Sequence, residues 1–296
     1  MIKQTVRRIL PRKIIRSWEQ WRDRERLSRA ERAVAAFRRP SARSHGLPSQ
    51  LIVSLTSYPQ RYGTLAKTLK GLLAQTISPD RTILWIAKAD MATLPDDVKD
   101  LRSCGLEIRP CHDLRSYNKI IHTLKLWPDA YAVTADDDLY YEPKWLETLV
   151  QGVRPGEKVI ICRRAIRPKR IGDSFAAFVE WQQDIITNGE LVDDLFPTGV
   201  GGVLYPPHSL SPEVMDEEVF TTLCPHDDDS WLYLMSRRAG SKYSQVGGGF
   251  AQTMWPGSQV TSLMSVNLIE GENDRQFRAV IEHYASSTPA NEAKLT

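Results

Sequence analysis

The fold is set by the run Tyr131-Ala132-Val133-Thr134-Ala135-Asp136-Asp137-Asp138-Leu139-Tyr140-Tyr141. Its first half is apolar and rich in strand-forming residues, and it stops at three consecutive aspartates. Pro143-Lys144-Trp145-Leu146 then predicts a new helix. Adjacent carboxylates repel one another, so three of them after a buried strand are unfavourable unless a cation is near. The run predicts a strand whose acidic tip binds a divalent ion, with a solvated Asp-rich turn as the alternative.

Strands and helices alternate on both sides of this run. Apolar, β-branched runs predict further strands over 51–57, 82–87 and 106–109. Helical spacing predicts helices around 65–73, 96–103, 119–126 and 231–238. This alternation is typical of an α/β fold with a mostly parallel, Rossmann-like sheet and helices on both faces. Ligands of such sheets bind beyond the carboxyl ends of the strands, where the three aspartates are expected.

The basic residues concentrate at one end of the chain. Residues 1–43 contain 14 Lys and Arg against four Asp and Glu, whereas the remainder carries a net charge of −7. Ile, Leu and Trp recur among the arginines of residues 1–39, which predicts a basic amphipathic helical arm, broken or kinked at Pro11. Such a helix suits an anionic membrane surface, and a solvated arm packed on the protein or on a partner is the equal alternative. Because the body is acidic, no nucleic acid is expected as a partner.

Length and composition predict one large α/β domain over 50–285, preceded by the arm over 1–43 and followed by a tail over 286–296. The chain has 296 residues, of which 42% are hydrophobic and 25% charged. Its four cysteines show no C-x-x-C spacing, so neither a zinc site nor a redox motif is predicted. No apolar run approaches the ~18–20 residues that cross a bilayer. We expect a cytoplasmic protein, attached to the inner face of the membrane if the arm binds lipid.

Four ordered segments resemble GT-A glycosyltransferases, in particular bacterial family 2-like enzymes of capsule and O-antigen synthesis. They are Val53–Pro59 with Arg61 and Gln75-Thr76, Ser116–Lys119 with Asp136–Asp138, Pro197–Pro207, and Pro225–Leu232. The resemblance spans residues 50–275 and implies the GT-A form of the α/β fold. Parts of it are also similar to the exostosin-type transferase domain, whose stereochemical outcome differs. Inverting and retaining mechanisms therefore both stay open.

The resemblance assigns a donor site and a metal site. The residues implied to bind the nucleotide-sugar donor are Thr56, Tyr58, Arg61, Lys119, Asp136 and Asp137. Asp136 and Asp138 would hold Mn²⁺ or Mg²⁺, since alternate side chains of an extended loop face the same way and these ions prefer oxygen ligands. A turn after a strand is the structural alternative for Tyr58, and an exposed helix position is the alternative for Lys119.

A second acidic cluster, Asp227-Asp228-Asp229, precedes a helical pattern that ends at Gly240. Capping and the helix dipole explain one or two of these aspartates but not three. The resemblance implies a catalytic carboxylate here, with Asp229 as first choice and Asp228 as second, and the helix start predicts that it stays ionised. Gly201, Gly202 and Trp231 are expected to face the acceptor or the sugar, with a flexible turn as the alternative for the glycines.

The expected activity is transfer of a sugar from a nucleotide sugar, a UDP-sugar first, to a bacterial surface polysaccharide or lipid-linked oligosaccharide. A nucleotidyltransferase is one alternative, although Ser57–Gly63 makes a poor glycine-rich phosphate loop. The other is a non-catalytic glycan- or lipid-binding partner in a polysaccharide assembly complex.

Overall fold

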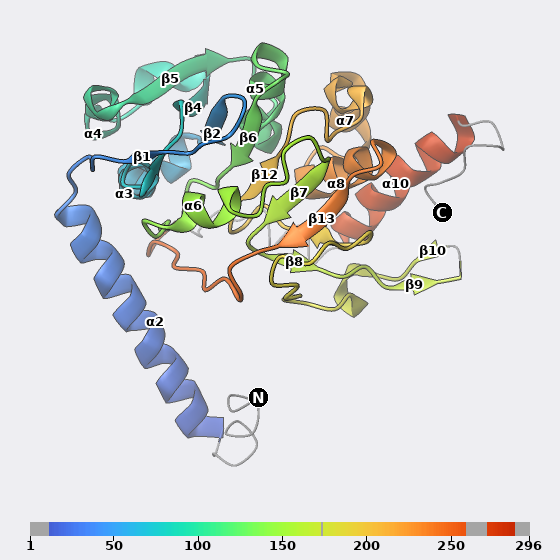
Figure 1. Cartoon of the computed structure of the whole chain (residues 1–296), viewed down its shortest axis with the longest axis horizontal. Helices are drawn as coiled ribbons and strands as arrows, with labels where there is room; N and C mark the ends of the chain where they lie inside the picture. The colour runs from blue at the N-terminus through green and yellow to red at the C-terminus, as the bar shows by residue number, and fades with distance from the viewer. Residues whose placement is uncertain (1–11, 173, 259–270, 288–296) are drawn as a thin grey trace.

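A seven-stranded sheet forms the centre of the protein. Its strands are, in chain order, β2 (Leu51–Thr56), β4 (Arg81–Ala87), β5 (Leu106–Cys111), β6 (Tyr131–Thr134), β7 (Val159–Cys162), β12 (Val203–Tyr205) and β13 (Lys242–Gln245). Their spatial order is β13-β7-β12-β6-β2-β4-β5 (Figure 1). Six strands run in one direction, and β12 is antiparallel to both of its neighbours. The computed structural model describes residues 12–172, 174–258 and 271–287.

Helices cover both faces of the sheet. The α-helices are α2 (Arg12–Ala35), α3 (Tyr62–Leu73), α4 (Asp96–Lys99), α5 (Ile121–Leu126), α6 (Trp145–Val150), α7 (Glu217–Leu223), α8 (Asp228–Arg238) and α10 (Glu272–Ser287). The 3-10 helices are η1 (Pro59–Arg61), η2 (Lys88–Thr93), η3 (Asp100–Cys104), η4 (Arg115–Lys119), η5 (Phe178–Glu180) and η6 (Pro212–Met215). One core contains α3 and α6, and a second contains α7, α8 and α10.

Strand β2 shows why the sheet is buried on both sides. Its side chains alternate, so Leu51, Val53 and Leu55 share a core with the leucines of α3. Ile52 lies in a different core, with Trp85 of β4. All three residues named from the first face are fully buried. A strand covered on both faces needs a continuous apolar run, which is what the sequence has there.

The predicted α/β fold with a mostly parallel sheet is confirmed, and the four predicted strands lie within one or two residues of β2, β4, β5 and β6. The second half of the sheet was not predicted from the sequence. There β12 inserts between β6 and β7, and a segment of short strands precedes it. These are β8 (Ala165–Ile166), β9 (Arg170–Ile171), β10 (Ser174–Phe175) and β11 (Phe196–Pro197).

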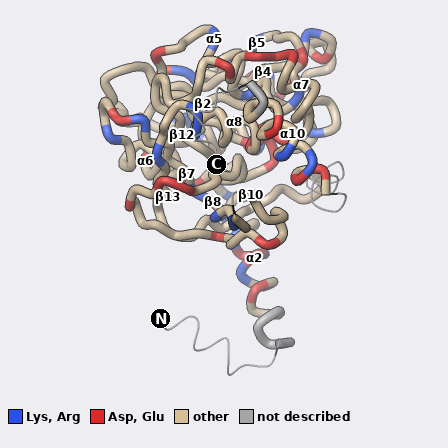
Figure 2. The backbone as a smooth tube through the Cα atoms, turned by 90° about the vertical axis from the view of Figure 1, so that its right-hand side faces the viewer, with Lys and Arg blue, Asp and Glu red and all other residues tan. Residues whose placement is uncertain are grey.

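Helix α2 projects from the body, and only its C-terminal half is packed (Figures 1 and 2). Ala30 and Val34 are buried against Trp255. Near the other end, Trp18 and Trp21 are 56% and 60% exposed. No helix in the described part of the chain is long and apolar enough to cross a membrane. Residues 1–11 of the predicted arm and 288–296 of the predicted tail lie outside the described residues.

The segment between α2 and β2 is attached to the body. Its strand β1 (Arg43–Ser44) pairs in parallel with β3 (Ile77–Ser78). Arg43 also forms an ion pair with Glu147 of α6, with 2.6 Å between Nη2 and Oε1. The chain therefore enters β2 along a fixed path.

Candidate functional site

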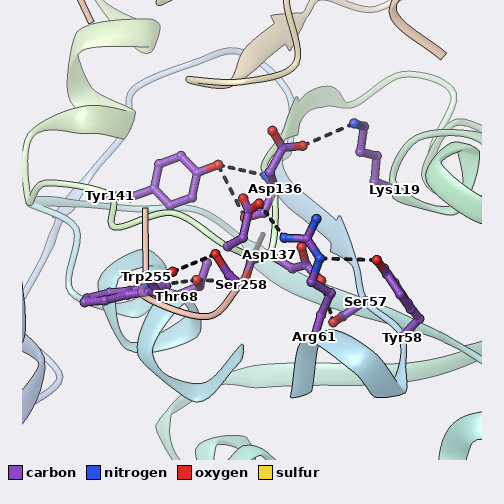
Figure 3. A network of polar contacts seen from close by, with 11 residues as sticks. Ser57, Tyr58, Arg61, Thr68, Lys119, Asp136, Asp137, Tyr141, Trp255 and Ser258 are labelled. Atoms are coloured by element: carbon purple, nitrogen blue, oxygen red, sulfur yellow. Dashed lines mark hydrogen bonds and ion pairs between the residues drawn. The ribbon is translucent and has the colours of Figure 1, made fainter. Parts of the chain in front are cut away.

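The site lies at the carboxyl ends of β2 and β6, which are parallel neighbours in the sheet. Ser54 pairs with Thr134, so the loops that leave the two strands start side by side. One loop carries Ser57, Tyr58 and Arg61, and the other carries Asp136 and Asp137 (Figure 3), followed by Asp138. The sequence predicted the aspartates at a carboxyl end of the sheet, and the resemblance implied that Tyr58 and Arg61 share their site.

Asp138 and Arg61 form a buried ion pair across the two loops. The distance from Asp138 Oδ2 to Arg61 Nη1 is 2.5 Å, and the two residues are 9% and 8% exposed. Arg61 Nε also donates a hydrogen bond of 3.2 Å to the hydroxyl of Tyr58. Burial alone would lower the pKa of Arg61, but Tyr58, Asp137 and Asp138 raise it on balance. Arg61 is therefore a permanent positive charge at the floor of the site.

Asp137 is held between the same two loops. The hydroxyl of Ser57 donates a hydrogen bond of 2.6 Å to its carboxylate, and Thr68 of α3 donates one of 2.9 Å to its backbone carbonyl. Burial raises the pKa of Asp137 to about 7, although Ser57 opposes this shift. Its role in the structure is to fix the acidic loop.

Thr56 and Tyr58 lie at the mouth of this arrangement. Thr56 donates a hydrogen bond of 3.0 Å to the carbonyl of Trp85, so its hydroxyl is already used by the neighbouring strand. Tyr58 is 38% exposed, and its ring faces outward beside the guanidinium of Arg61. Of the two, Tyr58 has the surface with which a bound ring could stack.

Lys119 connects the two acidic clusters. Its Nζ lies 3.3 Å from Asp136 Oδ1 and 2.9 Å from Asp228 Oδ2, and the residue is 7% exposed. Burial would lower the pKa of this amine, but Asp228, Asp136 and Asp229 raise it well above its usual value. The exposed-helix alternative for Lys119 is wrong, because the last turn of η4 turns the side chain inward. The clusters, 91 residues apart in sequence, face each other across one cation.

The second cluster begins helix α8. Asp227 accepts hydrogen bonds from the backbone N–H of Ser230 (3.1 Å) and from its hydroxyl (2.5 Å), so it caps the helix. Burial raises the pKa of Asp227 to about 6. One of the three aspartates is thus explained structurally, and Asp228 and Asp229 remain available for the site.

Asp229 accepts a hydrogen bond of 2.8 Å from the backbone N–H of Gly199. Burial, followed by the charge of Asp228, raises its pKa to about 8, against the opposing influence of Lys119 and the Gly199 N–H. The sequence predicted an ionised carboxylate from the helix start alone. Desolvation and a like charge outweigh the dipole here.

Two expectations for the acceptor side are corrected. Trp231 is fully buried, and its indole N–H donates a hydrogen bond of 3.2 Å to the carbonyl of Val214, so it belongs to the core and cannot contact a sugar. Gly202 has φ +91°, and a Cβ there would lie 2.5 Å from the ring of Trp145. At Gly201, with φ +102°, a Cβ would lie 3.0 Å from the ring of Phe250. These two glycines make room for aromatic side chains rather than for a sugar.

Gly199 is the glycine that faces the site. A Cβ at this position would lie 2.9 Å from Asp229 Oδ1 and 3.3 Å from Lys119 Nζ. The sequence contained this residue in its glycine-rich segment but gave no signal to separate it from its neighbours. Tyr141 was also missed, and its hydroxyl accepts a hydrogen bond of 2.7 Å from the backbone N–H of Asp136. The available signal was the aromatic pair Tyr140-Tyr141, which follows the aspartates after Leu139.

The chemistry of the site suits a divalent cation that binds together with a substrate diphosphate. Within the described ranges, no group of three or more His, Cys, Asp or Glu side chains is arranged to hold a metal ion. Mg²⁺ nevertheless needs only one or two protein carboxylates when water and substrate phosphates supply the rest. Asp136 and Asp138 provide such oxygens, and each of them now contacts a cationic side chain, Lys119 or Arg61. The donor set therefore fits an ion bound together with a diphosphate, not a preformed metal centre.

No protein-family model and no curated protein matches the chain. Three solved structures show a weak likeness in fold. CMP:2-keto-3-deoxy-manno-octonic acid synthetase complexed with CTP is 12% identical, with 76% of this chain and 99% of that chain covered and a TM-score of 0.38. UDP-glucose pyrophosphorylase from Acinetobacter baumanii is 8% identical, with 81% and 100% covered and a TM-score of 0.39. A protein described as a glucose-1-phosphate thymidylyltransferase from Bacillus anthracis is 10% identical, with 77% and 95% covered and a TM-score of 0.36. At these scores the likeness carries no statement about activity.

Proposed function

We propose that the protein is a metal-dependent glycosyltransferase that moves a sugar from a nucleotide sugar, a UDP-sugar first, to a bacterial surface polysaccharide or lipid-linked acceptor. One observation carries the proposal. Lys119 contacts Asp136 on one side and Asp228 on the other, so a site suited to a diphosphate and a candidate base face each other. Inverting glycosyl transfer uses both, one for the leaving group and one for the incoming hydroxyl.

On the donor side, Asp136 and Asp138 would hold Mg²⁺ or Mn²⁺. Such an ion, when bound, stabilises the negative charge that develops on the departing nucleoside diphosphate. Lys119 and Arg61 add two buried positive charges at the same edge of the sheet. Buried cations interact strongly with phosphate oxygens because little water screens them. The outward-facing ring of Tyr58 would contact the base of the nucleotide.

On the acceptor side, Asp229 would act as general base in the inverting form of the reaction. Its carboxylate takes the proton of the acceptor hydroxyl while that oxygen bonds to the anomeric carbon. The bond from the anomeric carbon to the phosphate oxygen breaks, and the nucleoside diphosphate leaves with the electron pair. A pKa of about 8 suits this role, because the base is then strong and still partly ionised near neutral pH. The N–H of Gly199 orients the carboxylate.

Helix α2 would place this chemistry at a membrane. Trp18 and Trp21 are exposed on a basic helix that projects from the body, which is the arrangement of an interfacial helix. A lipid-linked acceptor would then be presented from the inner face of the cytoplasmic membrane.

Product analysis tests the proposal directly. The full chain is incubated with Mn²⁺ and a panel of nucleotide sugars, and released nucleoside diphosphate is quantified, with Asp229→Asn as the inactive control. We expect one donor to be consumed by the wild type and none by the variant. Release of pyrophosphate from a nucleoside triphosphate and a sugar phosphate would instead identify a nucleotidyltransferase. Binding of glycans without consumption of any donor would identify a non-catalytic module.

A further inference from the structure

A cavity of about 420 Å³ lies between α2 and the ends of β7 and β13. Four arginines line it, namely Arg22 and Arg26 of α2 and Arg163 and Arg164, which follow β7. Asp184 is the one carboxylate among the described residues that line this arginine pocket. Arg164 pairs with Asp184, and Arg26 pairs with Asp23 on the same helix. The charges of Arg22 and Arg163 therefore leave the pocket with a net positive charge.

Three of these arginines have an Nε–H group without an acceptor among the described residues. The Nε–H groups of Arg22, Arg26 and Arg163 are buried and make no hydrogen bond within the described part of the chain. Arg163 also forms no ion pair with a carboxylate there, and burial lowers its pKa against the weaker influence of Glu142. A buried donor without an acceptor is destabilising by the free energy of its lost hydration. Among the four arginines, Arg22 and Arg163 thus line the cavity without a carboxylate partner in the part of the chain that the structure describes, so the cavity offers an anion two unpaired cations.

Arg164 connects the arginine pocket to the candidate site. It donates hydrogen bonds of 3.0 Å to Asp184 and 3.2 Å to the hydroxyl of Thr198. The backbone N–H of Thr198 donates a hydrogen bond of 3.2 Å to the backbone carbonyl of Arg164. The next residue, Gly199, donates to Asp229. Arg164 of the pocket therefore contacts Thr198, and Thr198 directly precedes Gly199, which orients the proposed base.

We propose that the arginine pocket binds a phosphate or diphosphate group of the acceptor substrate. Guanidinium groups bind phosphate oxygens in a bidentate manner, and a phosphate in the pocket would supply the anionic partner that Arg22 and Arg163 lack. Binding of the anion is independent of catalysis, whereas its identity as the acceptor rests on the proposed function. The phosphate can belong to a membrane lipid or to a soluble sugar phosphate. The exposed Trp18 and Trp21, on the same helix as Arg22 and Arg26, lie where a lipid headgroup would approach.

Titration with inorganic pyrophosphate tests the anion site in the full chain. EDTA is included so that the proposed metal-dependent donor site does not contribute. The double variant Arg22→Gln/Arg26→Gln should raise Kd about tenfold or more, because hydrogen bonds to charged groups are lost. The matched control Arg24→Gln/Arg29→Gln changes the same charge on the same helix outside the pocket and should bind as the wild type does.

Arg163→Gln provides an independent variant in the body of the protein, and the same rise in Kd is expected. Wild-type affinity in both pocket variants would overturn the proposal, as would an equal loss in the control, which would reduce the effect to net charge. Mn²⁺-dependent binding of UDP should be unchanged in Arg163→Gln. Failure of UDP to bind the wild type would count against the proposed function and leave the pyrophosphate result standing.

Vesicle sedimentation distinguishes the two sources of phosphate. Phosphatidylcholine vesicles with and without phosphatidic acid are compared for the wild type and Arg163→Gln. A gain from phosphatidic acid that the variant loses supports a lipid-linked phosphate, and an unchanged gain supports a soluble one. In the transfer reaction, Arg22→Gln/Arg26→Gln should raise KM for the acceptor and leave KM for the donor unchanged. A raised KM for the donor alone would overturn the assignment to the acceptor.

Discussion

Replacing Asp229 by Asn should make the protein more stable while removing its activity. The carboxylate is the proposed base, so transfer is lost, whereas donor binding on the opposite side of Lys119 is kept. The amide oxygen of Asn can still accept the hydrogen bond from the Gly199 N–H. The stabilisation follows from the pKa of Asp229, which is raised from its ordinary value of 3.8 to about 8.

The size and sign of this effect follow from proton linkage. Because the pKa is higher in the folded state, the folded protein binds more protons than the unfolded chain between about pH 4 and pH 8, and stability falls as pH rises through that window. A shift of about four units at about 1.4 kcal/mol each sets an upper bound of about 6 kcal/mol. Since part of the Asp229 side chain remains in contact with solvent, we expect about half of this bound. Asn has no such dependence.

Urea unfolding of both proteins at about pH 5 and about pH 8 measures the effect. The difference in unfolding free energy, variant minus wild type, should grow from under about 1 kcal/mol to about 3 kcal/mol. A variant that is less stable than the wild type at the higher pH would refute the account of a strained buried carboxylate. Turnover near the wild-type rate would refute the role of Asp229 as base.

Three further changes test neighbouring features. Gly199→Ala should lower kcat about tenfold with little change in Tm, because the new Cβ displaces the carboxylate of Asp229. The control Gly63→Ala, where a Cβ meets no atom within 4 Å, should leave kcat unchanged. Equal kcat values in the two variants would contradict this role of Gly199. Lys119→Met should lower the unfolding free energy by about 3 kcal/mol in urea titrations, because it leaves buried carboxylates without their cation; wild-type stability would disprove the ion-pair account. The double variant Trp18→Ser/Trp21→Ser should sediment less with anionic vesicles at unchanged Tm, and undiminished sedimentation would remove the membrane role of α2.

The tryptophan variant is the appropriate test of membrane binding because the C-terminal end of α2 packs on the body of the protein. Ala30 and Val34 pack on Trp255, and strand β1 continues the attachment. A deletion of residues 1–43 would remove these contacts together with the exposed tryptophans. Loss of membrane binding and loss of stability could not then be separated.

The sequence predicted the half of the sheet in which local signals are strong. Strands β2 and β6 are buried on both faces, so their continuous apolar runs identified them. The parallel fold placed the three aspartates at the carboxyl end of the sheet, whereas Arg61 was grouped with them only through the family resemblance. Strand β12 has only three residues and inserts antiparallel between two others. Such a strand is determined by its pairing partners, which a sequence pattern does not show.

The sequence named most residues of the candidate site but not the contacts between them. The two acidic clusters can be recognised in the sequence. Their placement on either side of Lys119 depends on how η4 and α8 pack, which the sequence pattern does not show. Trp231 was expected to face the acceptor or the sugar, but it lies on the side of α8 that packs into the core. Gly199 could not be distinguished from Gly201 and Gly202, since only the fold determines what each glycine faces.

Calorimetric titration of UDP into the full chain, with Mn²⁺ and with EDTA, tests most directly whether the acidic loop after β6 holds a diphosphate through a metal ion. We expect binding to require Mn²⁺, to be lost in Asp138→Asn and to be kept in Asp229→Asn. Binding of UDP that is equally tight in EDTA, or that survives unchanged in Asp138→Asn, would contradict the proposed site.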